Sequence, residues 1–350
     1  MLPVERGVEL TRKLDALKWK KSLKWAFLPS HENDFINYFP FDLNDELKVV
    51  SEANGFIYVE DYTNADVIIL TAHGSDLSKY IWNLKIKKPD AIFAVWFWDN
   101  HLAHLDNMHT ALAADIFAPS HMYAADYLAN PMSTMLTFLP ACSGQWTKLE
   151  AIRLSNEYSH AKRSNQLLVN YVDYPDYWRS DVLKMLQKNC RQADVFLMPP
   201  DNRNRYFSKT KANQFKEWTT YKTTLILPVH KDVSTRIFDA LLAGQILIVP
   251  EIIEDFDRVI TPVDQEKLGI IRLVNFDLKN IVLAINAAVR KFDDMGADGV
   301  KSRFEFILHG HMLSDRLLQL IKLIFGFHAE HLHVNFNTQN LKHAGLCISK

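Results

Sequence analysis

The chain has 350 residues, of which 48% are apolar and 23% charged, and its formal net charge is −1 at pH 7. This length exceeds the usual size of one domain and predicts two domains, each with a hydrophobic core of its own. The near-zero net charge argues against a dedicated nucleic-acid binder, which would carry a basic surplus.

Cysteine usage and the N-terminal sequence indicate a reducing compartment. The three cysteines, Cys142, Cys190 and Cys347, are widely spaced and odd in number, which does not fit a disulfide framework. The N-terminal stretch has no apolar signal core, and no apolar run reaches the length of a membrane span. We therefore expect a cytoplasmic protein.

The first domain is expected within residues 1–150. Residues 8–20 form an amphipathic segment with lysines nearby at 18, 20, 21 and 24. This basic stretch suits either peripheral contact with the inner face of a membrane or a solvated helix, and the pattern favours the solvated helix. Predicted strands are Trp25–Pro29, Phe56–Glu60, Asp66–Thr71, Asp90–Trp98, Ile116–Ala118 and Met135–Leu139, and predicted helices are Asn44–Asn54, Ser75–Lys88, His101–Ala114 and His121–Ala129.

The alternation pauses at residues 141–165, where we place a linker, and then restarts in a second domain at 151–330, with a C-terminal tail at 331–350. Strands alternating with helices predict βαβ units and doubly wound parallel sheets. The second set of predicted strands is Leu167–Val172, Val195–Met198, Leu225–Val229, Ile246–Val249 and Ile270–Val274, and the predicted helices are Trp178–Asn189, 234–244, Leu278–Phe292 and Val300–Phe327.

The helix at 234–244 is the most informative element of the second domain. Ser234 or Thr235 can cap its start, and Gly244 can close it in a left-handed turn before the apolar strand at 246–249. Its N–H groups and Arg236 suit the phosphates of a phosphorylated sugar, and Asp239 could accept hydrogen bonds from ribose hydroxyls. An amphipathic helix ahead of a core strand in another kind of α/β protein is the alternative interpretation.

The pattern Arg-x-Phe-Asp-Ala-Leu-x-Ala-Gly at 236–244, followed by a hydrophobic strand, resembles the nucleotide-sugar segment of GT-B glycosyltransferases. It is most similar to the group 1 branch that includes the CgeB-like (spore maturation protein-like) enzymes. The resemblance implies two Rossmann-like domains facing a cleft, with a C-terminal helix that returns to the first domain. It also implies that Asp239 holds the ribose. Lys231 stands where many group 1 enzymes have a second glutamate, so their recognition of the sugar does not carry over.

Several basic residues near this helix could neutralise a diphosphate leaving group without a metal ion. The predicted nucleotide-sugar site therefore consists of Lys222, His230, Lys231, Ser234, Thr235, Arg236 and Asp239. Each lysine alone is more simply explained as an exposed charge.

A base that removes the acceptor proton is expected at the carboxyl ends of the first domain's strands. Asp99 is the first candidate, and His73 and His101 are the next. Asp99 could equally cap the helix that begins near residue 101.

Other chemistries find less support. The pair His309 and His311 lacks the spacing of a known zinc motif, and no G-x-G-x-x-G or Walker A loop is present. No metal and no cofactor are expected, with a nucleotide-sugar as co-substrate. We predict a metal-independent glycosyltransferase that acts on a glycan, a lipid-linked glycan or a protein acceptor, as in polysaccharide biosynthesis. The alternatives are a sugar-nucleotide epimerase and a non-catalytic glycan-binding or assembly protein.

Overall fold

The computed structural model describes residues 3–17, 19–29, 38–72, 77–98, 104–122, 134–135, 138–175, 177–199 and 209–330. Contacts between residues divide the chain into two compact units. The first consists of Met1–Ala141 and the stretch from Ser314, and the second of Cys142–Leu313. This division differs from the predicted domains 1–150 and 151–330, because the final helix belongs to the first unit, as the resemblance implied. The predicted tail at 331–350 lies outside the described residues.

The boundary falls between Ala141 and Cys142, and the backbone of the next residue, Ser143, is held within the second unit. The Ser143 N–H donates to the carbonyl of His311 at 3.0 Å, and the N–H of Leu313 donates to the carbonyl of Ser143 at 3.0 Å. Residues 142–150, which the sequence suggested would end the first domain, therefore begin the second unit.

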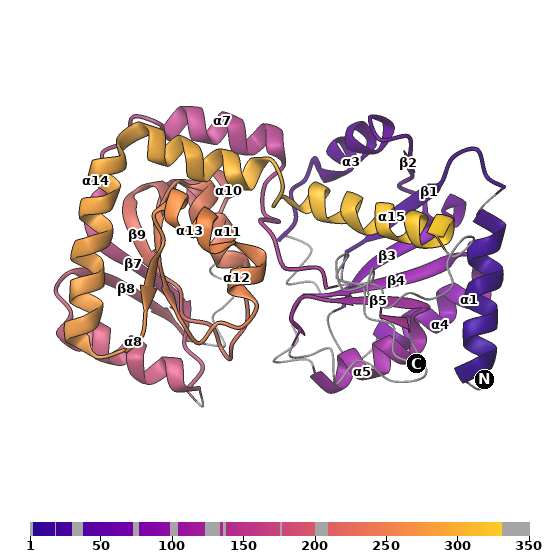
Figure 1. The fold of residues 1–350 in the computed structure, drawn as a ribbon, viewed down its shortest axis with the longest axis horizontal. Coiled ribbons are helices and arrows are strands. Elements are labelled where there is room, and N and C mark those ends of the chain that lie inside the picture. The colour runs from indigo at the N-terminus through magenta and orange to yellow at the C-terminus, as the bar shows by residue number, and fades with distance from the viewer. Residues whose placement is uncertain are drawn as a thin grey trace. The chain divides into compact units, whose positions relative to one another are not determined.

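The first unit contains a six-stranded parallel sheet with the order β2-β1-β3-β4-β5-β6 (Figure 1). Its strands are β1 (Lys24–Leu28), β2 (Ile57–Tyr58), β3 (Val67–Ala72), β4 (Ile92–Phe97), β5 (Ile116–Pro119) and β6 (Thr134–Met135). Its helices are α1 (Pro3–Leu17), α3 (Leu43–Glu52), the 3-10 turn η1 (Tyr62–Asn64), α4 (Leu77–Lys87), α5 (His104–Ala113) and α15 (Leu313–Glu330). The predicted parallel sheet is confirmed, and β4 is buried along its whole length, as expected for a central strand.

A buried cluster of charges fixes α1 to this sheet. The ammonium of Lys13, which is 3% exposed, donates to Asp115 at 3.1 Å and to the carbonyl of Ala91 at 2.9 Å. Lys85 of α4 reaches the other oxygen of Asp115 at 2.7 Å, and the N–H of Phe93 donates to the same carboxylate. Of the lysines noted near α1, Lys20 pairs with Asp66. No described helix is both long enough and apolar enough to span a bilayer.

The second unit contains a five-stranded parallel sheet with the order β11-β10-β9-β7-β8 (Figure 1). Its strands are β7 (Ser164–Val172), β8 (Ala193–Met198), β9 (Tyr221–Leu225), β10 (Ile246–Pro250) and β11 (Ile271–Leu273). Its helices are α7 (Lys148–Tyr158), α8 (Trp178–Asn189), α10 (Lys211–Thr219), α11 (Thr235–Leu242), α12 (Phe256–Val259), α13 (Pro262–Leu268) and α14 (Leu278–Leu308).

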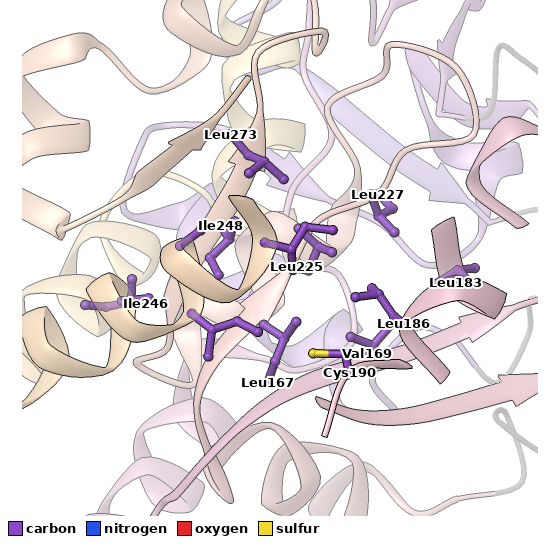
Figure 2. Close-up of a cluster of buried hydrophobic side chains, with 14 of the residues drawn as sticks. Leu167, Val169, Leu183, Leu186, Cys190, Leu225, Leu227, Ile246, Ile248 and Leu273 are labelled. Atoms are coloured by element: carbon purple, nitrogen blue, oxygen red, sulfur yellow. The ribbon is translucent and has the colours of Figure 1, made fainter. Parts of the chain in front are cut away.

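One face of this sheet packs against α8 and α14 (Figure 2). Alternate residues of β7 and β10, such as Leu167, Val169, Ile246 and Ile248, point into this core, because successive side chains of a strand lie on opposite faces. The central strands are thereby fixed in register, and their carboxyl ends form one edge of the sheet.

One predicted strand and two predicted helices differ clearly in their bounds from the structure. The strand expected at 225–229 is β9 at 221–225, because two polar residues of β9 are accommodated in the sheet: Thr223 and Thr224 donate to the carbonyls of Ile246 and Leu168, both at 2.8 Å. The helices expected at 278–292 and 300–327 are α14 and α15. The single non-helical residue within α14 is Gly296, with φ 53° and ψ −146°.

Candidate functional site

The strand order of the second unit reverses between β7 and β9. The chain passes from β7 through α8 to β8 on one side, and then through α10 to β9 on the other side of β7. Ligands of open parallel sheets gather at the carboxyl ends of the strands at such a switch point. A ligand site is therefore expected where the ends of β7 and β9 meet.

Helix α11 begins beside this switch point, with the boundaries that the sequence predicts. The hydroxyl of Ser234 accepts the N–H of Arg236 at 3.3 Å, so Ser234 is the N-cap and Thr235 is the first helical residue. Gly244, with φ +79°, follows the C-terminus in the left-handed conformation. Both predicted ends of the helix are confirmed.

Arg236 lies in a polar and aromatic environment at the start of α11. Its guanidinium is 4.2 Å from the ring centre of Tyr171 and 5.2 Å from that of Trp218, and it donates to the side-chain oxygen of Asn170. Asn170 is held in turn by its own amide, which donates to Glu217 at 3.2 Å. The side chain is half-buried. Two of these neighbours come from β7, so the carboxyl-terminal part of that strand positions Arg236.

A second arginine, which the sequence analysis missed, approaches the same tyrosine ring. The guanidinium of Arg179, on α8, is 5.2 Å from the ring centre of Tyr171 and donates to the carbonyls of Val172 at 3.0 Å and Leu227 at 3.4 Å. Burial lowers the pKa of Arg179, and the charge of Arg236 lowers it further, whereas Tyr171 acts in the opposite direction. Val172 is the last residue of β7, and Leu227 follows the end of β9. Arg179 therefore joins the two strands at the switch point.

The two guanidiniums bring two positive charges to this position, and the buried carboxyl of Asp239 is close enough to Arg236 to interact with it electrostatically. Among the described residues no carboxylate hydrogen-bonds either of them, although Asp232 is close enough to act on Arg179 electrostatically. The N-terminus of α11 adds the partial positive charge of a helix dipole. Together these groups could hold an anion. We call them the α11 anion site and define it as Arg236, Arg179 and the helix start at Ser234 and Thr235.

His230 and Lys231 follow β9 on the loop that leads to α11. The ring of His230 packs edge-on against Tyr177 with 5.4 Å between ring centres, and the backbone N–H of His230 donates to the carboxylate of Asp232 at 3.2 Å. Lys231 is exposed and pairs with Glu254 at 2.5 Å. Both residues lie on the carboxyl side of the sheet, but Lys231 already has a carboxylate partner.

Lys222 does not join the other predicted residues, which corrects the sequence analysis. It is the second residue of β9 and therefore lies at the amino edge of the sheet, whereas α11 begins at the carboxyl edge. Its ammonium pairs with Asp293 of α14 at 2.7 Å. Lys222 lies on the amino side of this strand with either set of bounds, whereas α11 follows the carboxyl end, so the two were wrongly grouped.

Asp239 lies inside the second unit. Its carboxylate, 2% exposed, accepts the hydroxyl of Ser143 at 2.8 Å and the amide of Gln145 at 2.6 Å. Burial raises its pKa to about 6, although both hydrogen bonds and the charges of Arg236 and Lys211 act in the opposite direction. A ribose could reach this carboxylate only if Ser143 or Gln145 moved away. The ribose contact therefore stays a prediction, while the structure shows Asp239 joining α11 to the segment at 143–145.

Lys211, at the start of α10, is a half-buried ionisable group close to Asp239. Burial lowers the pKa of its ammonium to about 8, and the charges of Asp239 and Glu150 partly restore it. No sequence pattern singles out Lys211, because its neighbours Asp239 and Glu150 are far away along the chain.

The predicted bases Asp99, His73 and His101 lie outside the described residues. His309 and His311 are described, and the ring of His311 stacks on Phe238 and Phe306 with 5.5 and 4.6 Å between ring centres. Within the described ranges no group of three or more His, Cys, Asp or Glu residues is arranged to hold a metal ion.

Comparison with known proteins finds similarity in structure alone. No protein-family model and no curated protein sequence match the chain. Sucrose-phosphate synthase from Thermosynechococcus elongatus is similar with a TM-score of 0.52 and 10% sequence identity, over 88% of this chain and 99% of that one.

Two further solved structures are similar at lower TM-scores. The catalytic domain of starch synthase IV from Arabidopsis thaliana, bound to ADP and acarbose, has a TM-score of 0.48 and 8% identity, over 86% of this chain and 78% of that one. α,α-Trehalose 6-phosphate synthase from Burkholderia multivorans has a TM-score of 0.46 and 10% identity, over 86% and 83%. This chain has the α/β fold of the GT-B glycosyltransferases, with two parallel sheets flanked by helices and a C-terminal helix. The predicted fold class is confirmed.

Proposed function

We propose that this protein is a glycosyltransferase that moves a sugar from a nucleotide-sugar donor to an acceptor hydroxyl. The observation that carries the proposal is the α11 anion site, in which Arg236 and Arg179 lie beside a helix N-terminus at the switch point of the second sheet. A nucleoside diphosphate is the anionic part of such a donor, and helix N-termini and arginines are the groups that bind phosphates in proteins.

The proposed chemistry follows from where charge develops. As the bond from the sugar to the diphosphate breaks, negative charge accumulates on the diphosphate, and donors already in place stabilise it. Arg236 is half-buried and can contact the phosphates directly, whereas Arg179 is 6% exposed and contributes chiefly its charge. With His230 on the neighbouring loop, these groups would supply the positive charge for a transfer without a metal ion.

The acceptor side of the reaction rests on the sequence. We keep Asp99 as the proposed base, with His73 and His101 as alternatives, and a glycan, a lipid-linked glycan or a protein as the acceptor. The sequence pattern at 236–244 supports a relationship of this chain to the CgeB-like branch of the GT-B enzymes. Asp239 would contribute to the ribose only after a rearrangement of its hydrogen bonds to Ser143 and Gln145.

The donor assignment is tested by nucleotide binding. Uridine, adenosine, guanosine, cytidine and thymidine diphosphates are added separately, and thermal unfolding and calorimetry report binding, since a ligand that binds only the folded state raises its apparent stability. We expect one of them to bind and the variant Arg236→Ala to weaken that binding at least tenfold. The matched control is Arg290→Ala, which removes an exposed arginine of α14.

Equal affinity in the Arg236→Ala variant and the wild type would refute the α11 anion site. A second measurement separates transfer from epimerisation. The identified sugar nucleotide is incubated alone and its sugar is analysed. An isomerised sugar in the absence of any acceptor would support the epimerase instead.

A further inference from the structure

A second positively charged position lies at the opposite end of α11, at the amino edge of the same sheet. It is a solvent-open cavity of about 600 Å³. We call it the amino-edge pocket and define it by Lys162, Arg163, Asn165, Lys222, Phe292 and Gly296. None of these residues belongs to the α11 anion site, and Lys222 is the one predicted donor ligand that the structure places elsewhere.

The residues that line this pocket carry basic groups and no acidic ones. Lys162 is exposed, and Lys222 pairs with Asp293 at 2.7 Å, beside the pocket. Arg163 donates to the backbone carbonyls of Tyr221 at 3.3 Å and Ala243 at 2.8 Å, and no carboxylate of the described chain pairs with it. Burial lowers the pKa of Arg163 to about 10, so its charge is poorly solvated.

A second guanidinium, that of Arg303, strengthens the positive charge behind the pocket. Arg303 and Arg163 both lie 5.4 Å from the ring centre of Phe292. Arg303 is 0% exposed and donates to the carbonyls of Gly244 and Leu268, while its Nη2 is buried and has no hydrogen-bond partner. Buried charges are costly unless they are neutralised, and within the described part of the chain Arg163 and Arg303 donate to carbonyls and not to carboxylates.

The backbone beside the pocket also leaves room for a ligand. Gly296 interrupts α14 with φ 53°, and a Cβ atom built on it would meet no atom within 4 Å. The interruption is therefore not explained by close packing at that residue. It opens the helix next to the cations, and a second helical run begins at Ala297, which also lines the pocket.

The amino-edge pocket differs in charge from another cavity of the second unit. Another surface cavity, of about 660 Å³, is lined by the acids Asp264, Asp298 and Glu305 together with the bases Lys267 and Lys301. Its three carboxylates outnumber its two lysines, so this cavity does not favour an anion. The amino-edge pocket has basic residues, an aromatic ring and an amide, which suit a phosphate joined to a small polar body.

We propose that the amino-edge pocket binds a phosphorylated small molecule, with its phosphate among Lys162, Arg163 and Lys222 and its remaining part against Phe292 and Asn165. The volume exceeds what a phosphate ion needs and lies in the range of small-molecule sites. This site is separate from the donor site and does not depend on the proposed reaction.

Helix α11 connects the two positions. Arg163 holds the carbonyl of Ala243, the C-cap of α11, and Arg303 holds that of Gly244, whereas Arg236 lies in the first turn at the other end. A ligand that draws Arg163 toward the pocket would act on the end of the helix that carries the donor-binding arginine. The pocket is therefore placed to serve as an effector site. This effector role rests on the proposed function, whereas binding in the pocket does not.

The test uses glucose 6-phosphate as a probe and the full chain in calorimetric titrations. The background variant Arg236→Ala removes the α11 anion site, so that binding which remains reports on the second site. In that background, Lys162→Gln combined with Lys222→Gln is expected to weaken binding of the probe at least tenfold. The control pair is Lys188→Gln with Lys279→Gln, which removes two exposed lysines elsewhere on the same unit and should leave the affinity unchanged.

Three results would overturn the proposal: no binding by the wild type, complete loss of binding in Arg236→Ala alone, or equal affinity in the Lys162/Lys222 and control pairs. If the Lys222 substitution disturbs folding, Lys162→Gln alone answers the question, because that side chain is exposed and makes no contact that folding requires. A failed nucleotide titration would not affect these outcomes, since the probe contains no nucleotide.

Discussion

The guanidinium of Arg236 lies 4.2 Å from the ring centre of Tyr171, and that of Arg179 lies 5.2 Å from the same ring. The Tyr171 hydroxyl donates to the carbonyl of Leu225 and accepts the N–H of Leu227, at 2.8 and 2.9 Å. The ring is thus fixed between β7 and β9, and cation–π attraction places two positive charges around it. A rigid tyrosine therefore determines where the positive charge of the α11 anion site is concentrated.

Arg179 should contribute to stability as well as to charge. The substitution Arg179→Met leaves the buried carbonyls of Val172 and Leu227 without their donor, and we expect a loss of about 2 kcal/mol in the free energy of unfolding. Urea unfolding measures the loss. The control Arg191→Met removes an exposed arginine and should change stability by less than about 0.5 kcal/mol. Equal stability of the two variants would contradict the role of Arg179 in joining the strands.

Asp239 should make stability depend on pH between about 4 and 6. Its pKa is raised from 3.8 to about 6 by burial, so in this range the folded protein binds a proton that the unfolded chain has lost. The contribution of Asp239 to the free energy of unfolding therefore falls as the pH rises through this range. Above this range the contribution is constant. The shift corresponds to about 3 kcal/mol.

The measurement for Asp239 compares the wild type with Asp239→Asn by chemical unfolding at several pH values. The wild type should lose about 3 kcal/mol relative to the variant between pH 4 and 6.5, because asparagine does not titrate. The control Asp181→Asn changes an exposed carboxylate of α8 and should show no such trend. A pH-independent difference for Asp239→Asn would mean that the buried carboxyl has an ordinary pKa.

Asp115 is expected to be the most sensitive charged residue of the first unit. Asp115→Ala leaves Lys13 and Lys85, which are 3% and 14% exposed, without their shared carboxylate. Removing one partner of a buried ion pair typically costs 3–5 kcal/mol, and we expect a loss of about that size. Asp90→Ala is the control, because Asp90 is 79% exposed in its pair with Arg12 and should contribute at most about 1 kcal/mol. Similar losses in thermal unfolding would show that the triad is not effectively buried.

Two features disfavour a side chain at Gly244: the close approach of Val300 and the positive φ angle. Their effects can be measured separately. A Cβ atom there would lie 2.6 Å from Cγ1 of Val300, and φ is +79°. Gly55 has φ +78° with no atom within 4 Å of the same position, so Gly55→Ala tests the backbone conformation alone. We expect Gly55→Ala to cost about 1 kcal/mol and Gly244→Ala at least twice as much, measured by scanning calorimetry. Equal losses would show that Val300 moves aside freely.

The sequence indicated those features that depend on neighbouring residues. The alternation of apolar strands with helices predicted both parallel sheets, and the pattern around 234–244 predicted α11 with its cap at Ser234 and its closing glycine at 244. Propensity, capping and periodicity act within a few residues, so one sequence is sufficient to detect them. The same local pattern identified Arg236 as a candidate phosphate ligand.

Only the tertiary structure decided which distant residues meet. It joined Asp239 to Ser143 and Gln145, brought Arg179 of α8 to the ring that Arg236 contacts, and placed Lys222 at the far edge of the sheet from α11. These contacts depend on strand order and on the point at which β9 enters the sheet, and nothing local encodes either. Charge and burial at a site are sums over such neighbours, so they follow from the fold rather than from any single segment.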